Sequence, residues 1–323
     1  MKGISVIICC YNSEKLIEMS LGYLAKQHVQ ILPAWEIVLV NNNSKDDTVS
    51  VAESFWKSTG VNVPLRIIQE NKQGLIHARK TGIMSVQYDT IVFCDDDNFL
   101  APDYLETAWK IMQAHPEVGI LGGESKGYYT CPEPSWLPQM YAAYALGKQF
   151  SITGDITTTK GQVWGAGMVS QTKLMQEIFQ EEFVTTGRSG KNLASGDDTE
   201  ICYKAVLKGY RIFYDESLKL QHYITPPRLT WEYAIRLSKG HIDTLINMIS
   251  LRREAIEKND VNARTYLKDL LYAIRYTFKP GYLLKMRSIT NLKDHEGDFK
   301  YWKAYFDLYY IFVLLKKKIL NLN

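Results

Sequence analysis

Apolar and polar positions follow one another in blocks along the first 116 residues of the chain. Short, nearly continuous apolar runs are typical of strands buried on both faces of a sheet, whereas apolar positions three and four apart indicate amphipathic helices. The runs predict strands over residues 4–12, 35–43, 64–71 and 90–98, and the segments between them predict helices over 13–27, 46–58, 74–86 and 102–116.

This alternation of strand and helix predicts an α/β fold, with a doubly wound, mostly parallel sheet and helices on both of its faces. Ligands bind such sheets at the carboxyl ends of the strands. Each predicted strand ends on polar residues, so these residues are expected to share one site: Asn12, Asn41 to Ser44, Asn71, and Asp95 to Asp97.

The alternation stops after about residue 120, and from Thr230 the pattern is helical almost to the end of the chain. We therefore expect a ligand-binding α/β domain over residues 1–230 and a helical C-terminal extension over 231–323. The five cysteines show no CxxC pair and no metal-type spacing, which indicates reduced thiols in a reducing compartment.

The net charge of +3 hides an asymmetry, since residues 231–323 carry 17 Lys and Arg against 10 Asp and Glu. Such a basic extension either binds an anionic partner, a membrane surface above all, or is a solvated helical face. The apolar part of residues 304–320 is shorter than the roughly 20 residues that span a bilayer. This segment is expected either to lie in a membrane interface or to pack on the domain.

Neither a GxGxxG after the first strand nor a P-loop is present, which argues against a glycine phosphate cradle. Asp95 and Asp97 form a DXD motif, and alternation along an extended chain would place them on one face. Two such carboxylates hold a hard divalent cation, Mg²⁺ or Mn²⁺. The alternative is a solvated acidic turn or a helix cap.

A second acidic pair, Asp197 and Asp198, precedes a predicted helix and is either an N-cap or a source of a general base. His222 follows the next predicted strand and is either structural or a ligand of metal or diphosphate. Arg228 is either a surface cation or a phosphate ligand. The segment 130–147 is rich in aromatic residues and Pro. It forms either an acceptor platform, that is, aromatic faces on which a substrate sugar stacks, or a plain hydrophobic cap.

The chain resembles the inverting glycosyltransferases of family 2 in segments that follow in the same order: SVIICCYN, VLVNNNSKDDT, NKQGLIHARKTG, FCDDDN, GAGMV, SGDDTEICYKAVLKGYRIFYD and QHY. The resemblance covers residues 4 to about 240. It implies the A-type, single nucleotide-binding α/β fold and a nucleotide-diphosphate sugar donor.

The resemblance also implies roles for individual residues. Asp198 would be the catalytic base, assisted by Asp197, and Asp97 would hold the metal together with His222. The donor would be bound by a larger set: Asn12, Asn41, Asn43, Asn71, Arg79, Asp95, Asp96, Gly165, Gly167 and Arg228.

Two departures from the family pattern concern substrate binding. The family commonly has Asp where this chain has Asn41; an amide can donate to a uracil or thymine carbonyl, whereas a carboxylate accepts from the ring N–H, so this position leaves the base open. The donor expected first is a UDP-sugar. Where the family commonly has Glu-Asp, this chain has Asp197-Asp198. The first side chain of the pair is therefore one methylene shorter and reaches less far. The Gly-rich segment before this pair carries Arg188 and Lys191 and is either a mobile lid or a surface loop.

The sequence therefore predicts a metal-dependent, inverting glycosyltransferase that moves a sugar to a hydroxyl of a glycan or lipid-linked acceptor in surface polysaccharide synthesis. We expect it in the cytoplasm, free or peripheral on the inner face of the membrane, with no nucleic-acid partner. One alternative is a nucleotidyltransferase, which usually needs a Gly-rich basic loop after the first strand. The other is a non-catalytic nucleotide-sugar-binding protein, and the acids at both clusters argue against it.

Overall fold

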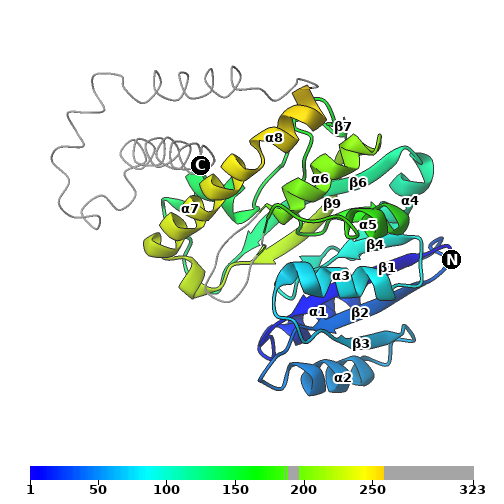
Figure 1. Cartoon of the computed structure of the whole chain (residues 1–323). Helices are drawn as coiled ribbons and strands as arrows, with labels where there is room; N and C mark the ends of the chain where they lie inside the picture. Colours follow the sequence, from blue (N-terminus) through cyan, green and yellow to red (C-terminus); the bar gives the residue numbers. More distant parts are fainter. Residues whose placement is uncertain (186, 188–195, 258–323) are drawn as a thin grey trace.

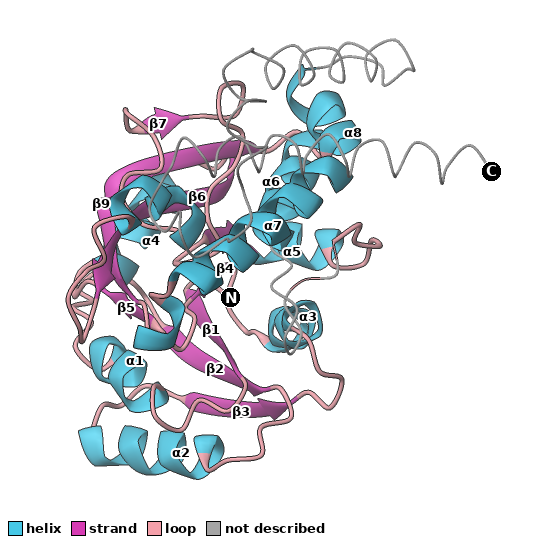
Figure 2. Cartoon of the chain, turned by 90° about the vertical axis from the view of Figure 1, so that its left-hand side faces the viewer, coloured by secondary structure: helices cyan, strands magenta, loops and turns pink. Residues whose placement is uncertain are grey.

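One mixed sheet of nine strands runs through the molecule (Figures 1 and 2). Its strand order is β3-β2-β1-β4-β8-β6-β9-β5, with β7 paired to β9. The computed structural model describes residues 1–185, 187 and 196–257. The expectations for Arg188, Lys191 and residues 304–320 lie outside this part of the chain.

The N-terminal half of the sheet is parallel, as predicted. It contains β1 (Ile4–Cys10), β2 (Trp35–Asn41), β3 (Leu65–Gln69) and β4 (Thr90–Phe93). The predicted helices between them are present as α1 (Ile17–Leu24), α2 (Thr48–Thr59) and α3 (Leu75–Ser85). β1, β3 and β4 end before the polar residues that follow them, so Asn12, Asn71 and the three acids lie in loops. Asn41 is the last residue of β2 and is paired in the sheet, and the rest of its cluster follows in a loop.

The C-terminal half of the sheet is mixed, which the prediction of a mostly parallel sheet did not anticipate. Its strands are β5 (Asn98–Leu100), β6 (Val118–Tyr128), β7 (Gly154–Asp155), β8 (Val169–Gln171) and β9 (Arg211–Tyr223). β6 and β9 pair in parallel, whereas β5, β7 and β8 pair antiparallel with their neighbours. These three strands are short, and β7 and β8 lie beyond residue 120, where the predicted alternation of strand and helix stops.

Helices cover both faces of the sheet, which confirms the doubly wound arrangement (Figure 2). Alternate residues of β1 point to opposite faces: Val6 packs in the cluster with α1, α2 and α4 (Tyr104–Ala114), and Ile7 packs in the cluster with α3, α5 (Thr172–Ile178) and α6 (Asp197–Leu207). Complete burial of one such side chain contributes about 1.5–3 kcal/mol to folding.

The described part of the C-terminal extension packs on the α/β domain. The helix α7 (Trp231–Asn247) contacts the 3₁₀ helix η1 (Leu137–Tyr144), with the rings of Trp136 and Trp231 5.2 Å apart. The following α8 (Ile249–Arg252) and the π-helical turn η3 (Arg253–Glu257) lie against α6. The helical prediction is confirmed as far as residue 257, while the proposed boundary at 230 stays a prediction.

Two further findings concern the cysteines and the length of the apolar helices. All five cysteines are free thiols, as predicted. Within residues 1–185, 187 and 196–257, no helix combines the length and the apolar character that crossing a bilayer requires.

Candidate active site

The three acids after β4 form a turn, and the prediction of a continuous strand over residues 90–98 was wrong there. β4 ends at Phe93 and β5 begins at Asn98, whose N–H donates to the carbonyl of Asp95 at 2.9 Å. Strand alternation therefore does not set the directions of the acids. Each of the three instead has a different partner.

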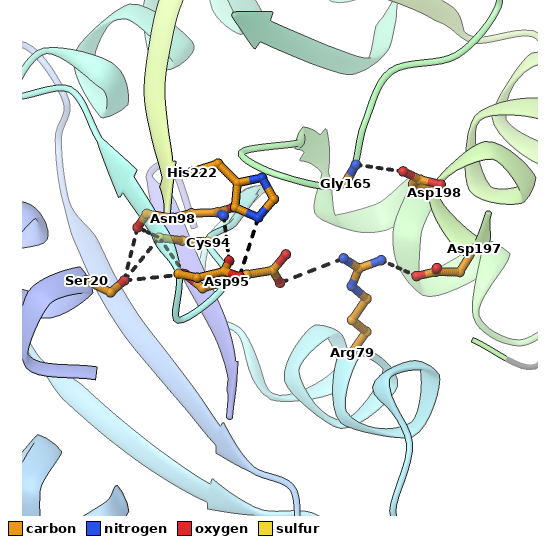
Figure 3. Close-up of polar contacts among 10 residues, drawn as sticks. Ser20, Arg79, Cys94, Asp95, Asn98, Gly165, Asp197, Asp198 and His222 are labelled. Carbon is orange, nitrogen blue, oxygen red and sulfur yellow. Dashed lines mark hydrogen bonds and ion pairs between the residues drawn. The ribbon is translucent and has the colours of Figure 1, made fainter. Parts of the chain in front are cut away.

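Asp95 faces Arg79, a buried residue of α3 (Figure 3). The Arg79 guanidinium lies 3.9 Å from the Asp95 carboxylate, donates a hydrogen bond to Asp197 on α6, and covers the ring of Phe93. Burial lowers the pKa of Arg79, but Asp197 and Asp95 more than offset this, so its pKa is raised and it stays charged. One buried cation thus joins the two acidic clusters that the sequence separates by about a hundred residues.

Asp96 turns the other way and accepts a hydrogen bond from the hydroxyl of Ser13. Burial and the neighbouring Asp97 carboxylate raise the pKa of Asp96 to about 7. The adjacent acids thus relieve part of their mutual repulsion by favouring the neutral form of the middle residue.

Asp97 is held by two groups from the end of β9 and the segment beyond it. Its Oδ2 lies 2.7 Å from Arg228 Nη1 and 3.4 Å from His222 Nε2. The register explains this contact, since His222 on β9 pairs with Asn98, the residue after Asp97. His222 is buried, and its Nδ1 has no hydrogen-bond partner among the described residues.

Asp198 lies in the first turn of α6, with both carboxylate oxygens fixed by backbone donors. Oδ2 accepts from the N–H of Gly165 at 3.0 Å (Figure 3). Oδ1 accepts from the N–H of Thr199 at 2.8 Å. Burial and the neighbouring Asp197 raise the pKa of Asp198 above its ordinary value. A Cβ on Gly165 would lie 2.9 Å from Arg79 Nη2, so glycine permits this close approach.

These residues line one cavity of about 650 Å³. The cavity brings together most of the residues that the sequence singled out: Arg79, Asp95, Asp96, Asp97, Gly165, Asp197, Asp198, His222 and Arg228. Such a volume falls in the range of small-molecule sites.

Five of the predicted donor-binding residues do not line this cavity, and four of them are asparagines. Asn12 and Asn41 hold the loop after β2, because they accept hydrogen bonds from the backbone N–H groups of Lys45 and Ser44. Asn43 accepts one from the Lys45 ammonium, and Asn71 is exposed. Their roles in donor binding stay predictions.

Gly167 also lies outside the cavity lining and has a clear structural part. Its φ is +70°, and an added Cβ would lie 2.4 Å from Leu220 Cδ2. Its carbonyl accepts a hydrogen bond from the Tyr104 hydroxyl at 2.5 Å. Gly167 therefore shapes the turn that follows Gly165.

Asn42 belongs to the predicted cluster Asn41 to Ser44 and lines the cavity. It donates to the carbonyls of Glu70 and Lys72 and so ties two loops together. Other lining residues were not predicted, because they come from segments without a recognisable motif: Lys160, Gln162, Trp164, His241, Thr244 and Met248. No periodic signal marks them.

The aromatic segment 130–147 forms a hydrophobic cap at one end and lines the cavity at the other. Trp136 and Leu137 are buried in a cluster with α7, as a hydrophobic cap would be. Ala142 to Ala145 line the cavity at the other end of the same segment. Whether they contact an acceptor stays a prediction.

Comparison with known proteins agrees with this geometry. The family model described as "Glycosyl transferase family 2" matches residues 5–179. The glucosyl-dolichyl phosphate glucuronosyltransferase of Haloferax volcanii is 21% identical over 271 residues, covering 83% of each chain. The poly-beta-1,6-N-acetyl-D-glucosamine synthase of Staphylococcus aureus is 24% identical over 261 residues, which cover 76% of this chain and 56% of that longer protein.

Solved structures show the same fold. The mannosyltransferase PcManGT of Pyrobaculum calidifontis, in complex with GDP-Man and Mn²⁺, matches with a TM-score of 0.59 and 18% identity, covering 98% of this chain and 87% of that one. Residues 1–349 of S. aureus TarS, in complex with UDP-GlcNAc, match with a TM-score of 0.54 and 17% identity, covering 98% and 91%.

The residues matched by the family model include β1 to β4, the acidic turn after β4 and the Gly165 turn. The similarity to the solved structures covers nearly the full length of the chain. The chain therefore belongs to glycosyl transferase family 2, and it is a glycosyltransferase.

Proposed function

We propose that this enzyme transfers a sugar from a nucleotide-diphosphate donor, a UDP-sugar in preference, to a hydroxyl group with inversion at the anomeric carbon. The observation that carries the proposal is Asp198: a partly buried carboxylate in the cavity, fixed by two backbone donors and with a raised pKa. A carboxylate with a raised pKa is a stronger base than an exposed one.

In the proposed step, a lone pair of Asp198 accepts the proton of the acceptor hydroxyl. The hydroxyl oxygen attacks the anomeric carbon, and the bond from that carbon to the diphosphate oxygen breaks, so the electron pair leaves with the nucleoside diphosphate. Each carboxylate oxygen has two lone pairs, so the bonds from Gly165 and Thr199 leave capacity for the proton. Direct displacement of this kind inverts the anomeric centre.

Arg228 and His222 are suited to the leaving diphosphate. Burial lowers the pKa of Arg228 and Asp97 raises it, with a net rise, so the guanidinium stays charged. Its remaining N–H donors and the imidazole lie beside Asp97 at one part of the cavity. The guanidinium would bind phosphate oxygens that become more negative as the bond breaks, and the imidazole would do so when it does not hold a cation.

The donor set around Asp97 also fits a divalent cation. Among the described residues, no three His, Cys, Asp or Glu side chains form a metal-binding group. Mg²⁺ and Mn²⁺ are commonly bound by only one or two protein ligands plus substrate phosphates and water. Asp97 and His222 would supply those ligands, and the cation, when bound, would neutralise charge on the diphosphate. The Mn²⁺ complex of PcManGT supports this proposal.

The acceptor is proposed from the relatives. The name of the Haloferax enzyme specifies a glucosyl-dolichyl phosphate, and that of the S. aureus synthase a polysaccharide. A glycan or lipid-linked acceptor in surface polysaccharide synthesis therefore remains our proposal. A cytoplasmic site, free or on the inner membrane face through the basic extension, accords with five free thiols and the charge of residues 231–323.

Substitution of Asp198 tests this function. Asp198→Asn removes the base and keeps the size of the side chain, so we expect sugar transfer from a UDP-sugar to fall by at least 100-fold. Binding of UDP, measured by calorimetry in the same samples, serves as the control for folding. Transfer at near the wild-type rate by a variant that binds UDP normally would refute the assignment of the base.

A further inference from the structure

Lys160 differs from the other cations described in the cavity wall. Arg79 and Arg228 are each paired with carboxylates, whereas no carboxylate of the described residues lies within ion-pair distance of Lys160. Its ammonium donates to the carbonyl of Gln149 at 2.7 Å and lies 5.3 Å from the centre of the Trp164 ring. The side chain is largely withdrawn from solvent and still lines the cavity.

The surroundings of Lys160 are fixed by hydrogen bonds. Buried Gln149 accepts from the N–H of Trp164 at 2.7 Å and donates to the carbonyl of Gly123 at 2.8 Å. Gly161, which follows Lys160, has a φ of +63° and lies so close to Ile256 of η3 that a Cβ would be 2.2 Å from it. The ammonium is therefore presented by a packed loop rather than by a freely moving one.

This loop leads directly to the proposed base. Trp164 precedes Gly165, whose N–H donates to Asp198. Burial lowers the pKa of Lys160, and Asp198 is one of the two groups that raise it, whereas the acids after β4 are not among them. The loop that carries Lys160 also packs on α6, the helix of Asp198, since the Val163 carbonyl accepts from the Cys202 thiol and Gln162 accepts from the Tyr203 hydroxyl. Lys160 therefore belongs to the part of the cavity around Asp198.

Lys160 is partly buried and no carboxylate of the described residues pairs with it, so an anionic ligand would offset part of the free energy that its ammonium loses by leaving water. We propose that Lys160 forms an anion-binding subsite for the saccharide next to Asp198, and that this saccharide carries a carboxylate or a phosphate group. The proposal rests on the proposed function, since it concerns the substrates of the same cavity. Donor sugar and acceptor are both sources of such a group.

Binding titrations with matched pairs of probes test the subsite and distinguish the two sources. In the donor arm, UDP-glucuronate is compared with UDP-glucose in the presence of Mn²⁺. In the acceptor arm, glucuronate and glucose 6-phosphate are compared with glucose on enzyme loaded with UDP and Mn²⁺. We expect the wild type to bind the anionic probe about tenfold more tightly in one arm, as for one charge-assisted contact.

Lys160→Met should abolish this preference, and Lys160→Arg should retain most of it. Lys126→Met removes the same charge from an exposed position on β6 and should keep the preference. Wild-type enzyme without preference in either arm, or a preference that persists in Lys160→Met, would overturn the proposal. Failure of every protein to bind UDP would instead count against the proposed function.

Discussion

At the residue scale, Asp198 shows how the surroundings of a carboxylate set its chemistry. Burial and the neighbouring Asp197 raise its pKa, while the N–H groups of Gly165 and Thr199 lower it in part and fix its direction. The sequence identified the residue types in this cluster through the family resemblance. Burial and the contact with Gly165 depend on the folded chain, so no local pattern reveals them.

The raised pKa of Asp198 predicts a difference in the pH dependence of stability. Between its unfolded pKa of about 4 and its raised folded pKa, the folded protein binds more protons at this site than the unfolded chain does. The contribution of Asp198 to stability therefore falls as pH rises through this interval. We expect the free energy of unfolding of Asp198→Asn to increase relative to the wild type over the same interval.

Urea unfolding at a series of pH values from 4 to 8 measures this difference. In Asp198→Asn, the amide NH₂ faces a backbone N–H from which the carboxylate accepted a hydrogen bond. The lost bond lowers the free energy of unfolding by an amount that does not change with pH. The slope of the difference between the two proteins against pH is therefore the readout. Parallel curves for the two proteins would show that the pKa of Asp198 is not raised in the folded state.

At the scale of elements, the predicted and observed strands differ mainly where the site is built. Strands β1 to β4 follow from continuous apolar runs, and each ends earlier than predicted. Beyond β1, for example, Asn12 accepts a hydrogen bond from the loop after β2 instead of continuing the strand. The acidic turn between β4 and β5 lies in a segment whose composition also suits an extended strand. The antiparallel pairing of β5 with β9 distinguishes the turn from a continuous strand, and the local sequence does not reveal this pairing.

Arg79 links three of these elements, since it belongs to α3 and pairs with the β4–β5 turn and with α6. Arg79→Met leaves the buried Asp197 carboxylate without its counter-ion, so we expect the free energy of unfolding to fall by about 3 kcal/mol. Arg211→Met is a matched control, because Arg211 pairs with Asp155 at the surface. There a loss below about 1 kcal/mol is expected.

Denaturant unfolding of both variants at one pH provides the comparison. A loss in Arg79→Met no larger than in Arg211→Met would mean that the buried pairing does not hold α3 and α6 together. Recovery of part of the stability in Arg79→Lys would identify charge, rather than packing against Phe93, as the main contribution.

At the scale of the whole molecule, the cavity joins a parallel half of the sheet to a mixed half. The parallel half was predictable because its signals are local: short apolar runs alternate with amphipathic helices. The mixed half depends on β6 and β9, which pair residues as distant as Val118 and Arg211. Their pairing, and the cavity wall that includes Lys160 and Trp164, has no local signature in the sequence.

The central claim concerns the bond that breaks in the donor. The full chain is incubated with Mn²⁺ and UDP-glucose, UDP-N-acetylglucosamine or UDP-glucuronate, and the phosphorus products are identified by ³¹P NMR. We predict release of UDP from at least one donor, and loss of that release in excess EDTA. Release of pyrophosphate, or no turnover of any of these donors by enzyme that binds UDP, would contradict the account.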